Sequence, residues 1–210
     1  RRHRRFIRRS CVLWVMSVWV RSHFRRRRRE SIVYRGTPIV RFHGEEDRPL
    51  ETEFVGKIGR GRAVMKEMGG AAVQQSQLKE SAVSTLDDLL GFHVVPPTAV
   101  RRDEEGNIIS VQQLVPSPTK WRYLPSADKK MVNRDDLLKI AIIDIIVYQG
   151  DRHGGNLLVS PNGRAYAIDN ELILDPENFE SVAVAATLGD KIPSRILRRL
   201  KCLERGDFSA

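Results

Sequence analysis

The apolar pattern of the first half alternates between short strand-like runs and one long helix-like repeat. Residues 31–42 and residues 54–68 are rich in β-branched and aromatic positions interrupted by glycine, which is typical of strands joined by turns. We expect the first stretch to break at Gly36 and at Pro38. From residue 71 to residue 90, leucine and alanine recur at helical spacing. Gly91 follows directly, so the pattern predicts a helix that ends at a glycine cap.

The second half carries weaker strand signals around one strongly apolar helix. Asn133 stands before two aspartates and then a run of leucine and isoleucine, which predicts a capped helix that is apolar nearly all round and therefore buried. Short apolar runs on either side of glycine-rich turns predict strands. The expected elements, in order, are a hairpin of 94–100 with 108–115, a helix from 133 to about 148, strands at 157–159 and 165–168, and a helix from about 193 to 203.

This order places a sheet-rich half, residues 31–116, before a helical half, residues 117–210, which predicts an α+β fold with two lobes. Residues 1–30 form a separate extension. No run approaches 18 apolar residues, so the sequence predicts no transmembrane helix. Two cysteines, Cys11 and Cys202, give neither a disulfide framework nor a metal-binding spacing and are consistent with a reducing compartment.

Net charge changes this picture only at the N-terminal end. The chain has 36 basic and 26 acidic residues, a net charge of +10, but residues 1–29 contain 12 arginines and no acid. The remaining residues, 30–210, therefore hold 24 basic and 26 acidic residues, a net charge of −2. The body of the chain gives no global argument for binding nucleic acid.

Three interpretations of the arginine-rich extension, residues 1–30, remain open. Its basic segments flank an apolar stretch with Trp14 and Trp19, which would suit the anionic surface of a membrane. Nucleic acid is allowed by charge alone, although the body disfavours it. A disordered extension is the third reading. We expect a cytoplasmic protein, with peripheral contact to a membrane through this extension as an option.

The chemistry is concentrated in residues 150–156, Gly-Asp-Arg-His-Gly-Gly-Asn, directly after the apolar helix. Thirteen residues beyond Asn156, Asp169 ends the second strand of a predicted hairpin, and pairing of the two strands would bring Asp169 back beside Asn156. An acid and an amide that converge suit a hard cation such as Mg²⁺ carrying nucleotide phosphates, with Mn²⁺ as an alternative. Asp151 would then be free to orient an attacking hydroxyl, as phosphoryl transfer requires.

The motif Asp-Arg-His-x-x-Asn followed by Ile-Asp-Asn resembles the catalytic and metal-binding loops of phosphatidylinositol 3-/4-kinases and their bacterial relatives, including HipA-like kinases. The resemblance implies a small kinase-like fold with a reduced helical lobe. It implies that Asp151 is the catalytic aspartate, that His153 contacts the γ-phosphate or shares the base role, and that Asn156 and Asp169 hold the metal. Asn170 stands where many relatives have phenylalanine, whereas type II phosphatidylinositol 4-kinases resemble this sequence in having asparagine there.

The first half extends the resemblance to roughly residues 50–205. By likeness, Lys66 is the strand lysine that contacts the α- and β-phosphates of ATP, and Glu80 is the helix glutamate that pairs with it. Gln113 and Val115 fall in the segment whose backbone would meet adenine. The glycines at 59 and 61 lie too close to Lys66 for a phosphate loop and are expected to form the turn into its strand.

The resemblance predicts an ATP- and magnesium-dependent kinase that transfers the γ-phosphate to a hydroxyl group. The sequence leaves the acceptor open among proteins, lipids and small molecules. Residues 174–178, Leu-Asp-Pro-Glu-Asn, are acidic, whereas a phosphoinositide headgroup would require basic residues, so the sequence disfavours a lipid acceptor. A nucleotide-binding pseudokinase or regulatory module is the alternative function.

Overall fold

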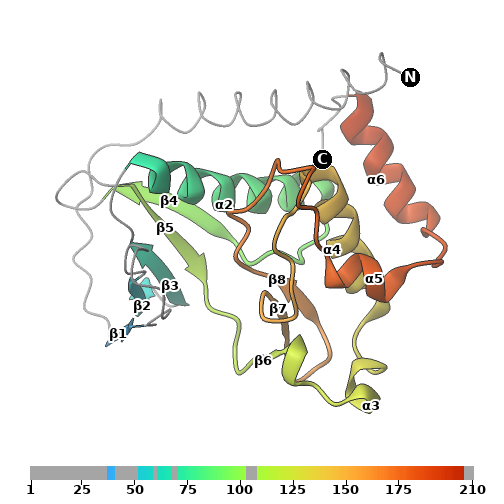
Figure 1. The fold of residues 1–210 in the computed structure, drawn as a ribbon, viewed down its shortest axis with the longest axis horizontal. Helices are drawn as coiled ribbons and strands as arrows, with labels where there is room; N and C mark the ends of the chain where they lie inside the picture. Colours follow the sequence, from blue (N-terminus) through green and yellow to red (C-terminus); the bar gives the residue numbers. More distant parts are fainter. Residues whose placement is uncertain (1–36, 41–51, 59–60, 68–70, 103–107, 206–210) are drawn as a thin grey trace.

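A computed structural model describes residues 37–40, 52–58, 61–67, 71–102 and 108–205. The first half forms a five-stranded antiparallel sheet, ordered β1-β2-β3-β5-β4 (Figure 1). The N-terminal extension, residues 1–30, and the readings attached to it lie outside the described residues. The strands are β1 (Thr37–Val40), β2 (Thr52–Ile58), β3 (Gly61–Glu67), β4 (Thr98–Arg102) and β5 (Ile108–Gln113).

The expected break at Pro38 is wrong. Pro38 lies inside β1 and opposite Phe54 of β2. β1 is an edge strand of the sheet, where proline, which has no N–H group, is tolerated. The expected hairpin of residues 54–68 is confirmed, because β2 and β3 pair in register from Thr52↔Glu67 to Ile58↔Gly61.

Helix α2 (Ala71–Leu90) has the bounds that the sequence predicts. It ends where Gly91 adopts a φ of 62°, a left-handed conformation that glycine adopts without steric cost. α2 packs on β4 and β5. The side chain of Gln77 is buried in this contact, and its Oε1 accepts a hydrogen bond of 3.0 Å from Ser110 N, so a polar side chain also ties the helix to the sheet.

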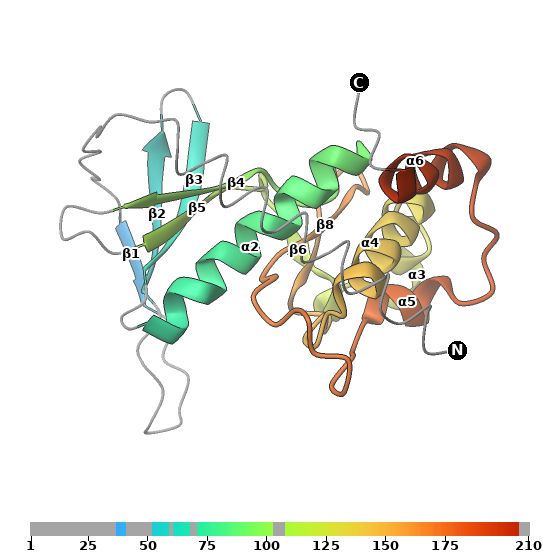
Figure 2. The same cartoon turned by 90° about the horizontal axis from the view of Figure 1, so that it is seen from above.

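The second half continues from the sheet into a smaller sheet and a group of helices. A second antiparallel sheet has the order β6-β7-β8. Figure 2 shows α2 between the five-stranded sheet and the helices of the second half. The elements are β6 (Thr119–Lys120), a 3-10 turn (Trp121–Tyr123), α3 (Ser126–Lys129), α4 (Arg134–Val147), β7 (Leu157–Val159), β8 (Ala165–Ala167), α5 (Val182–Thr187) and α6 (Ser194–Arg205).

Helix α4 forms the centre of the second half. Its first turn is capped as predicted, since Asn133 Oδ1 accepts hydrogen bonds from Asp135 N (3.0 Å) and Asp136 N (3.2 Å). Most of its apolar side chains are buried, and they join those of α2 and of β7 and β8 in one hydrophobic core. The mixed α+β class predicted from the sequence is therefore confirmed, with one core that runs across both halves.

Helix α5 was not predicted from the sequence. Ser181 caps it by accepting a hydrogen bond of 3.1 Å from Val184 N. A helix of six residues contains less than two turns, so it carries too few positions for a recognisable period. α5 packs against α4, and its first residue, Val182, donates a backbone hydrogen bond of 2.9 Å to Arg152 O.

Candidate functional site

Residues 150–156 are held between a helix end and a hairpin. α4 ends at Tyr148, whose φ of 51° turns the chain sharply out of the helix. At the other end, β7 and β8 pair from Leu157↔Ala167 onward, and Ile168 N donates to Asn156 O at 3.1 Å. The predicted hairpin is confirmed, and it sets the backbone of Asp169 beside that of Asn156. Asp169 has a φ of 60°, which turns the chain out of the hairpin at this residue.

Asp151 and Asn156 lie in direct contact. Asn156 Nδ2 donates to Asp151 Oδ2 at 3.2 Å and to Asp151 O at 3.0 Å. Asp151 N in turn donates to the buried side chain of Gln149, 3.1 Å from its Oε1. Because its amide nitrogen donates to Asp151, the orientation of Asn156 is fixed. Its amide oxygen and the Asp169 carboxylate are the hard oxygen ligands that Mg²⁺ prefers, so the donor set fits this ion.

His153 is exposed on the same loop, and its ring is oriented by the backbone. Gly155 N donates to His153 Nδ1 at 3.1 Å. In the neutral ring the proton is therefore on Nε2, which leaves an N–H donor on the far side of the imidazole. A Cβ atom at Gly155 would lie 2.7 Å from His153 Cε1, and one at Gly154 would lie 3.2 Å from Arg122 N. The two glycines admit these close approaches by neighbouring parts of the chain itself.

Glu80 lies on α2, and its side chain is buried. Its carboxylate accepts a hydrogen bond from Gln112 Nε2 at 2.8 Å and one from Asn170 Nδ2 at 3.2 Å. The backbone N–H of Asn170 also donates to Glu80. Glu80 thus connects the first half to the residue that follows Asp169. Lys66 lies on β3 opposite Ser110 of β5, its side chain is outside the described part, and the predicted pair with Glu80 stays a prediction.

Arg152 is fully buried and links the loop to two neighbouring segments, α4 and residues 168–170. Its guanidinium donates to Asp144 Oδ1 of α4, with Nη2 at 3.2 Å, and to Asn156 O at 3.2 Å. It also donates to Ile168 O and to Asn170 Oδ1. These partners satisfy a buried positive charge that would otherwise be strongly destabilising. Arg152 therefore fixes the separation between the loop and the segment of Asp169.

The structural roles of Arg152, Asp144 and Asn170 were not predicted from the sequence. One signal could have revealed Asp144, because it is an acid within a continuous run of isoleucines, and a carboxylate in a buried helix requires a partner. Its second oxygen accepts a hydrogen bond of 2.6 Å from Ser181 Oγ, which fastens the start of α5 to α4. No comparable signal marked Arg152 as the partner.

Gln113 and Val115 lie where β5 leaves the first sheet, and both line a cavity of about 290 Å³. Asp151, Asn156 and Asp169 do not line this cavity. Its wall consists of residues from the end of α2, the segment before β4, the end of β5 and β8: Asp88, His93, Val95, Pro96, Pro97, Gln113, Leu114, Val115, Pro116, Arg164 and Tyr166. Gln113 and Val115, the residues predicted to contact adenine, therefore lie at a cavity that Asp151, Asn156 and Asp169 do not line.

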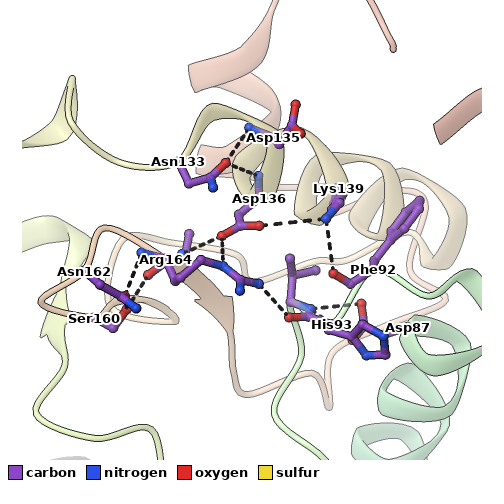
Figure 3. A network of polar contacts seen from close by, with 12 residues as sticks. Asp87, Phe92, His93, Asn133, Asp135, Asp136, Lys139, Ser160, Asn162 and Arg164 are labelled. Carbon is purple, nitrogen blue, oxygen red and sulfur yellow. Dashed lines mark hydrogen bonds and ion pairs between the residues drawn. The ribbon is translucent and has the colours of Figure 1, made fainter. Parts of the chain in front are cut away.

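A polar network borders that cavity (Figure 3). Arg164 bridges Asp136 of α4 and the backbone carbonyl of His93. Lys139 Nζ lies 3.9 Å from Asp136 Oδ1 and donates to Phe92 O at 3.3 Å. The network connects the start of α4, the turn between β7 and β8, and the segment that follows α2, and so it fastens both halves of the chain to each other.

Asp87 lies at the edge of this network and is buried. Its carboxylate accepts hydrogen bonds from Val94 N and Val95 N, with distances to Oδ2 of 3.1 Å in both cases. Burial raises the pKa of Asp87 to about 6, against the opposing effect of these two hydrogen bonds. Asp87, Asp88 and His93 offer ligand atoms within 4.8 Å of one another, but the latter two are exposed and Asp87 serves the backbone. We assign no metal to this group.

The second half of the chain is similar to a known protein family. Residues 115–199 match the family model described as phosphatidylinositol 3- and 4-kinase. Over these residues the second half of the chain is similar to the kinase domain of that family. The match includes Asp151, Asn156 and Asp169, whereas Lys66 and Glu80 lie before it. The predicted resemblance to this family is confirmed.

Among solved structures, the chain is similar to a crystal structure of the Helicobacter pylori proinflammatory kinase CtkA. The two are 13% identical, with a TM-score of 0.48, over 82% of this chain and 68% of that chain. No curated protein sequence matches the chain. None of the helices in the described part of the chain is both long and apolar enough to cross a membrane.

Proposed function

We propose that the chain is an ATP- and Mg²⁺-dependent phosphotransferase that moves the γ-phosphate of ATP to a hydroxyl acceptor. The observation that carries this proposal is the contact between Asp151 and Asn156, 3.2 Å from Oδ2 to Nδ2, beside the backbone of Asp169. The three residues lie inside the region that matches the kinase family. A carboxylate next to an oxygen-rich cation site meets the two needs of phosphoryl transfer, a positioned nucleophile and compensation of phosphate charge.

In this proposal Asp151 orients the acceptor hydroxyl and receives its proton. The hydrogen bond from Asn156 holds one carboxylate oxygen, and the backbone contact to Gln149 holds the loop, so the carboxylate needs little reorganisation. His153 presents its Nε2–H toward the γ-phosphate, because Nδ1 is occupied by Gly155 N. The side chains of Asp151 and His153 are therefore oriented by the fold before a substrate binds.

Asn156 and Asp169 would hold the metal, Mg²⁺ or alternatively Mn²⁺, through an amide oxygen and a carboxylate. When bound, the cation supplies positive charge that offsets the negative charge of the phosphates during transfer. Arg152, which donates to the carbonyls of Asn156 and Ile168, sets the distance between the two segments that carry these ligands.

The first half would hold the nucleotide. Lys66 would contact the α- and β-phosphates, Glu80 would position it, and the backbone near Gln113 and Val115 would contact adenine. The division into a first lobe, residues 31–116, and a second lobe, residues 117–210, is part of the same proposal. Its support is that Glu80 on α2 contacts Asn170, the residue after Asp169, the proposed metal ligand.

A comparison of two aspartate substitutions tests this function. Asp169→Asn removes one charge from the metal ligands, and we expect ATP turnover to fall by at least about a hundredfold, in line with the loss of a major electrostatic contribution. Asp128→Asn, at an exposed position on α3, is the matched control and should keep wild-type turnover. Equal turnover of ATP by Asp169→Asn and the wild-type chain would contradict the assignment.

A nucleotide-binding pseudokinase is the alternative outcome of the same experiment. A titration with ATP and Mg²⁺, followed by thermal unfolding, reports binding independently of turnover. A rise in melting temperature without formation of ADP would identify a binding module. Formation of ADP that depends on Asp169 would identify the phosphotransferase.

A further inference from the structure

The segment that follows Asp169 lies along the end of α4 and the loop of the candidate site. It is fastened to that loop by a series of backbone hydrogen bonds rather than by side chains. The series consists of Gly150 N to Leu172 O (2.7 Å), Leu174 N to Val147 O (2.7 Å), Asp175 N to Tyr148 O (3.3 Å), Glu180 N to Gln149 O (3.0 Å) and Arg152 N to Glu180 O (3.1 Å). Because the backbone makes the attachment, most side chains of this segment stay exposed, although Ile173 is buried in the core.

Those side chains combine apolar and acidic groups. Leu172 is 51% exposed and Phe179 is 38% exposed, although each is large and apolar. Glu177 and Glu180 are exposed between and beside them. We use the name acceptor face for the outward side chains of this segment, which are Leu172, Leu174, Asp175, Glu177, Phe179 and Glu180.

The charge of the acceptor face has one sign. The sequence contains no lysine or arginine from residue 165 to residue 190. Lys79 of α2 lies close enough to act on the Asp175 charge, and Arg122 stacks on Tyr123 beside Gly154 at the other side of the loop. Against these two cations stand three acids on the face itself. An anionic headgroup would be repelled here, whereas a cationic polypeptide with apolar side chains is complementary in both respects.

The chain itself contains a segment of that composition. Residues 1–31 hold 12 arginines and a single acid, together with the apolar residues Phe6, Ile7 and Phe24. Ser10 follows two arginines, Ser22 follows one, and Ser31 stands two positions after a run of five. This segment offers hydroxyl groups within a strongly cationic context.

We propose that the acceptor face binds the arginine-rich segment, residues 1–31, and that the site phosphorylates serine within it, at Ser10, Ser22 or Ser31. This inference rests on the proposed function. In the reaction, a bond forms between serine Oγ and the γ-phosphorus, and the bond from that phosphorus to the β–γ bridging oxygen breaks. The serine proton passes to the Asp151 carboxylate and then to solvent, and ADP leaves.

The first experiment uses the full chain with Mg²⁺ and ATP labelled at the γ-phosphate, and it measures both ADP and the position of the label by peptide mapping. We expect label on serine within residues 1–31, and none there when Ser10, Ser22 and Ser31 are all replaced by alanine. If ADP forms while the label appears only elsewhere, on another part of the chain or on an added lipid or basic protein, the inference is overturned and the proposed function stands. If no ADP forms, both fail.

A charge exchange tests whether the acceptor face makes the selection. Two peptides are offered to the chain: residues 21–34, and the same peptide with Arg25 to Arg29 replaced by glutamate. The wild-type chain should prefer the arginine peptide by about tenfold, since several weak surface pairs act together. Glu177→Lys combined with Glu180→Lys should reverse this preference. A merely structural effect would lower labelling of both peptides equally, and an unchanged preference would overturn the assignment of the face.

Discussion

The side-chain amide of Asn170 donates a hydrogen bond to Glu80 Oε1 at 3.2 Å, across 90 residues of sequence. The carbonyl oxygen of the same amide accepts from Arg152. A single asparagine thus satisfies a buried acid on one side and a buried base on the other. A phenylalanine at this point would have neither a donor nor an acceptor in its side chain, so the asparagine has a specific role in this chain.

This arrangement predicts the effect of Asn170→Asp. The new carboxylate keeps an acceptor for Arg152 but sets two buried acids against each other at Glu80, and we expect a loss of about 2–4 kcal/mol in unfolding free energy. Glu80→Gln in the same chain restores a donor opposite the new acid and should recover most of that loss. Urea unfolding of the two single variants and the double variant checks it. Equal stability of Asn170→Asp and its double variant would contradict the pairing.

The buried pair of Arg152 and Asp144 gives a second prediction. Arg152→Met leaves the Asp144 carboxylate buried with only Ser181 as a described side-chain partner, and we expect a cost of about 3–5 kcal/mol. Asp144→Asn in the same chain removes the uncompensated charge, so the double variant should be more stable than Arg152→Met alone. Chemical unfolding at neutral pH measures both. A double variant less stable than the single one would show that the charge of Asp144 has another compensating partner.

The two neighbouring glycines of the loop should respond differently to alanine. At Gly155 the added Cβ meets the exposed ring of His153, which can swing away, so stability should change little while ATP turnover falls because the ring is displaced. At Gly154 it meets Arg122 N and the buried Trp121, 3.2 Å away in each case, and we expect a loss of about 1–3 kcal/mol in stability. Melting temperature and ADP formation, measured on both variants, separate the two effects. A large loss of stability in Gly155→Ala, together with unchanged stability in Gly154→Ala, would contradict the prediction.

The raised pKa of Asp87 predicts a pH dependence of stability. The pKa is about 6 in the folded chain against 3.8 as the ordinary value, so between these values the folded state binds a proton that the unfolded state does not. The unfolding free energy is therefore highest below pH 3.8 as far as this group is concerned, and falls by about 3 kcal/mol as the pH rises to about 6. Asp87→Asn should remove this fall, which urea midpoints at pH 4.5 and pH 7.5 would show. Asp88→Asn, at the exposed neighbour, is the control and should keep it.

Local signals predicted much of the fold. The bounds of α2 follow from helical spacing and from the glycine at its end, and the start of α4 follows from Asn133, because both features act through neighbouring residues. The strand through Pro38 was mispredicted because a proline is acceptable only at a sheet edge, and the position of a strand in a sheet is not a local property.

The sequence indicated which polar residues of the candidate site lie close together. It did not indicate which buried side chains hold them in place. The spacing of Asp151, Asn156 and Asp169 was sufficient to expect a hairpin that brings the last two together. The burial of Glu80 and Arg152 was not predictable, since it depends on which segments meet in three dimensions. The sequence gives the positions of the acidic and basic residues, but which of them are buried depends on the tertiary structure.

The contact between Glu80 and Asn170 also bears on where the chain can be divided. The region that matches the kinase family begins at residue 115, and α2 lies entirely before it. A polypeptide started at that point would contain the loop, the hairpin and Arg152, but the backbone N–H of Asn170 would lose the carboxylate that accepts from it. The smallest autonomous folding unit is therefore larger than the family match, and truncated versions for expression should begin before α2.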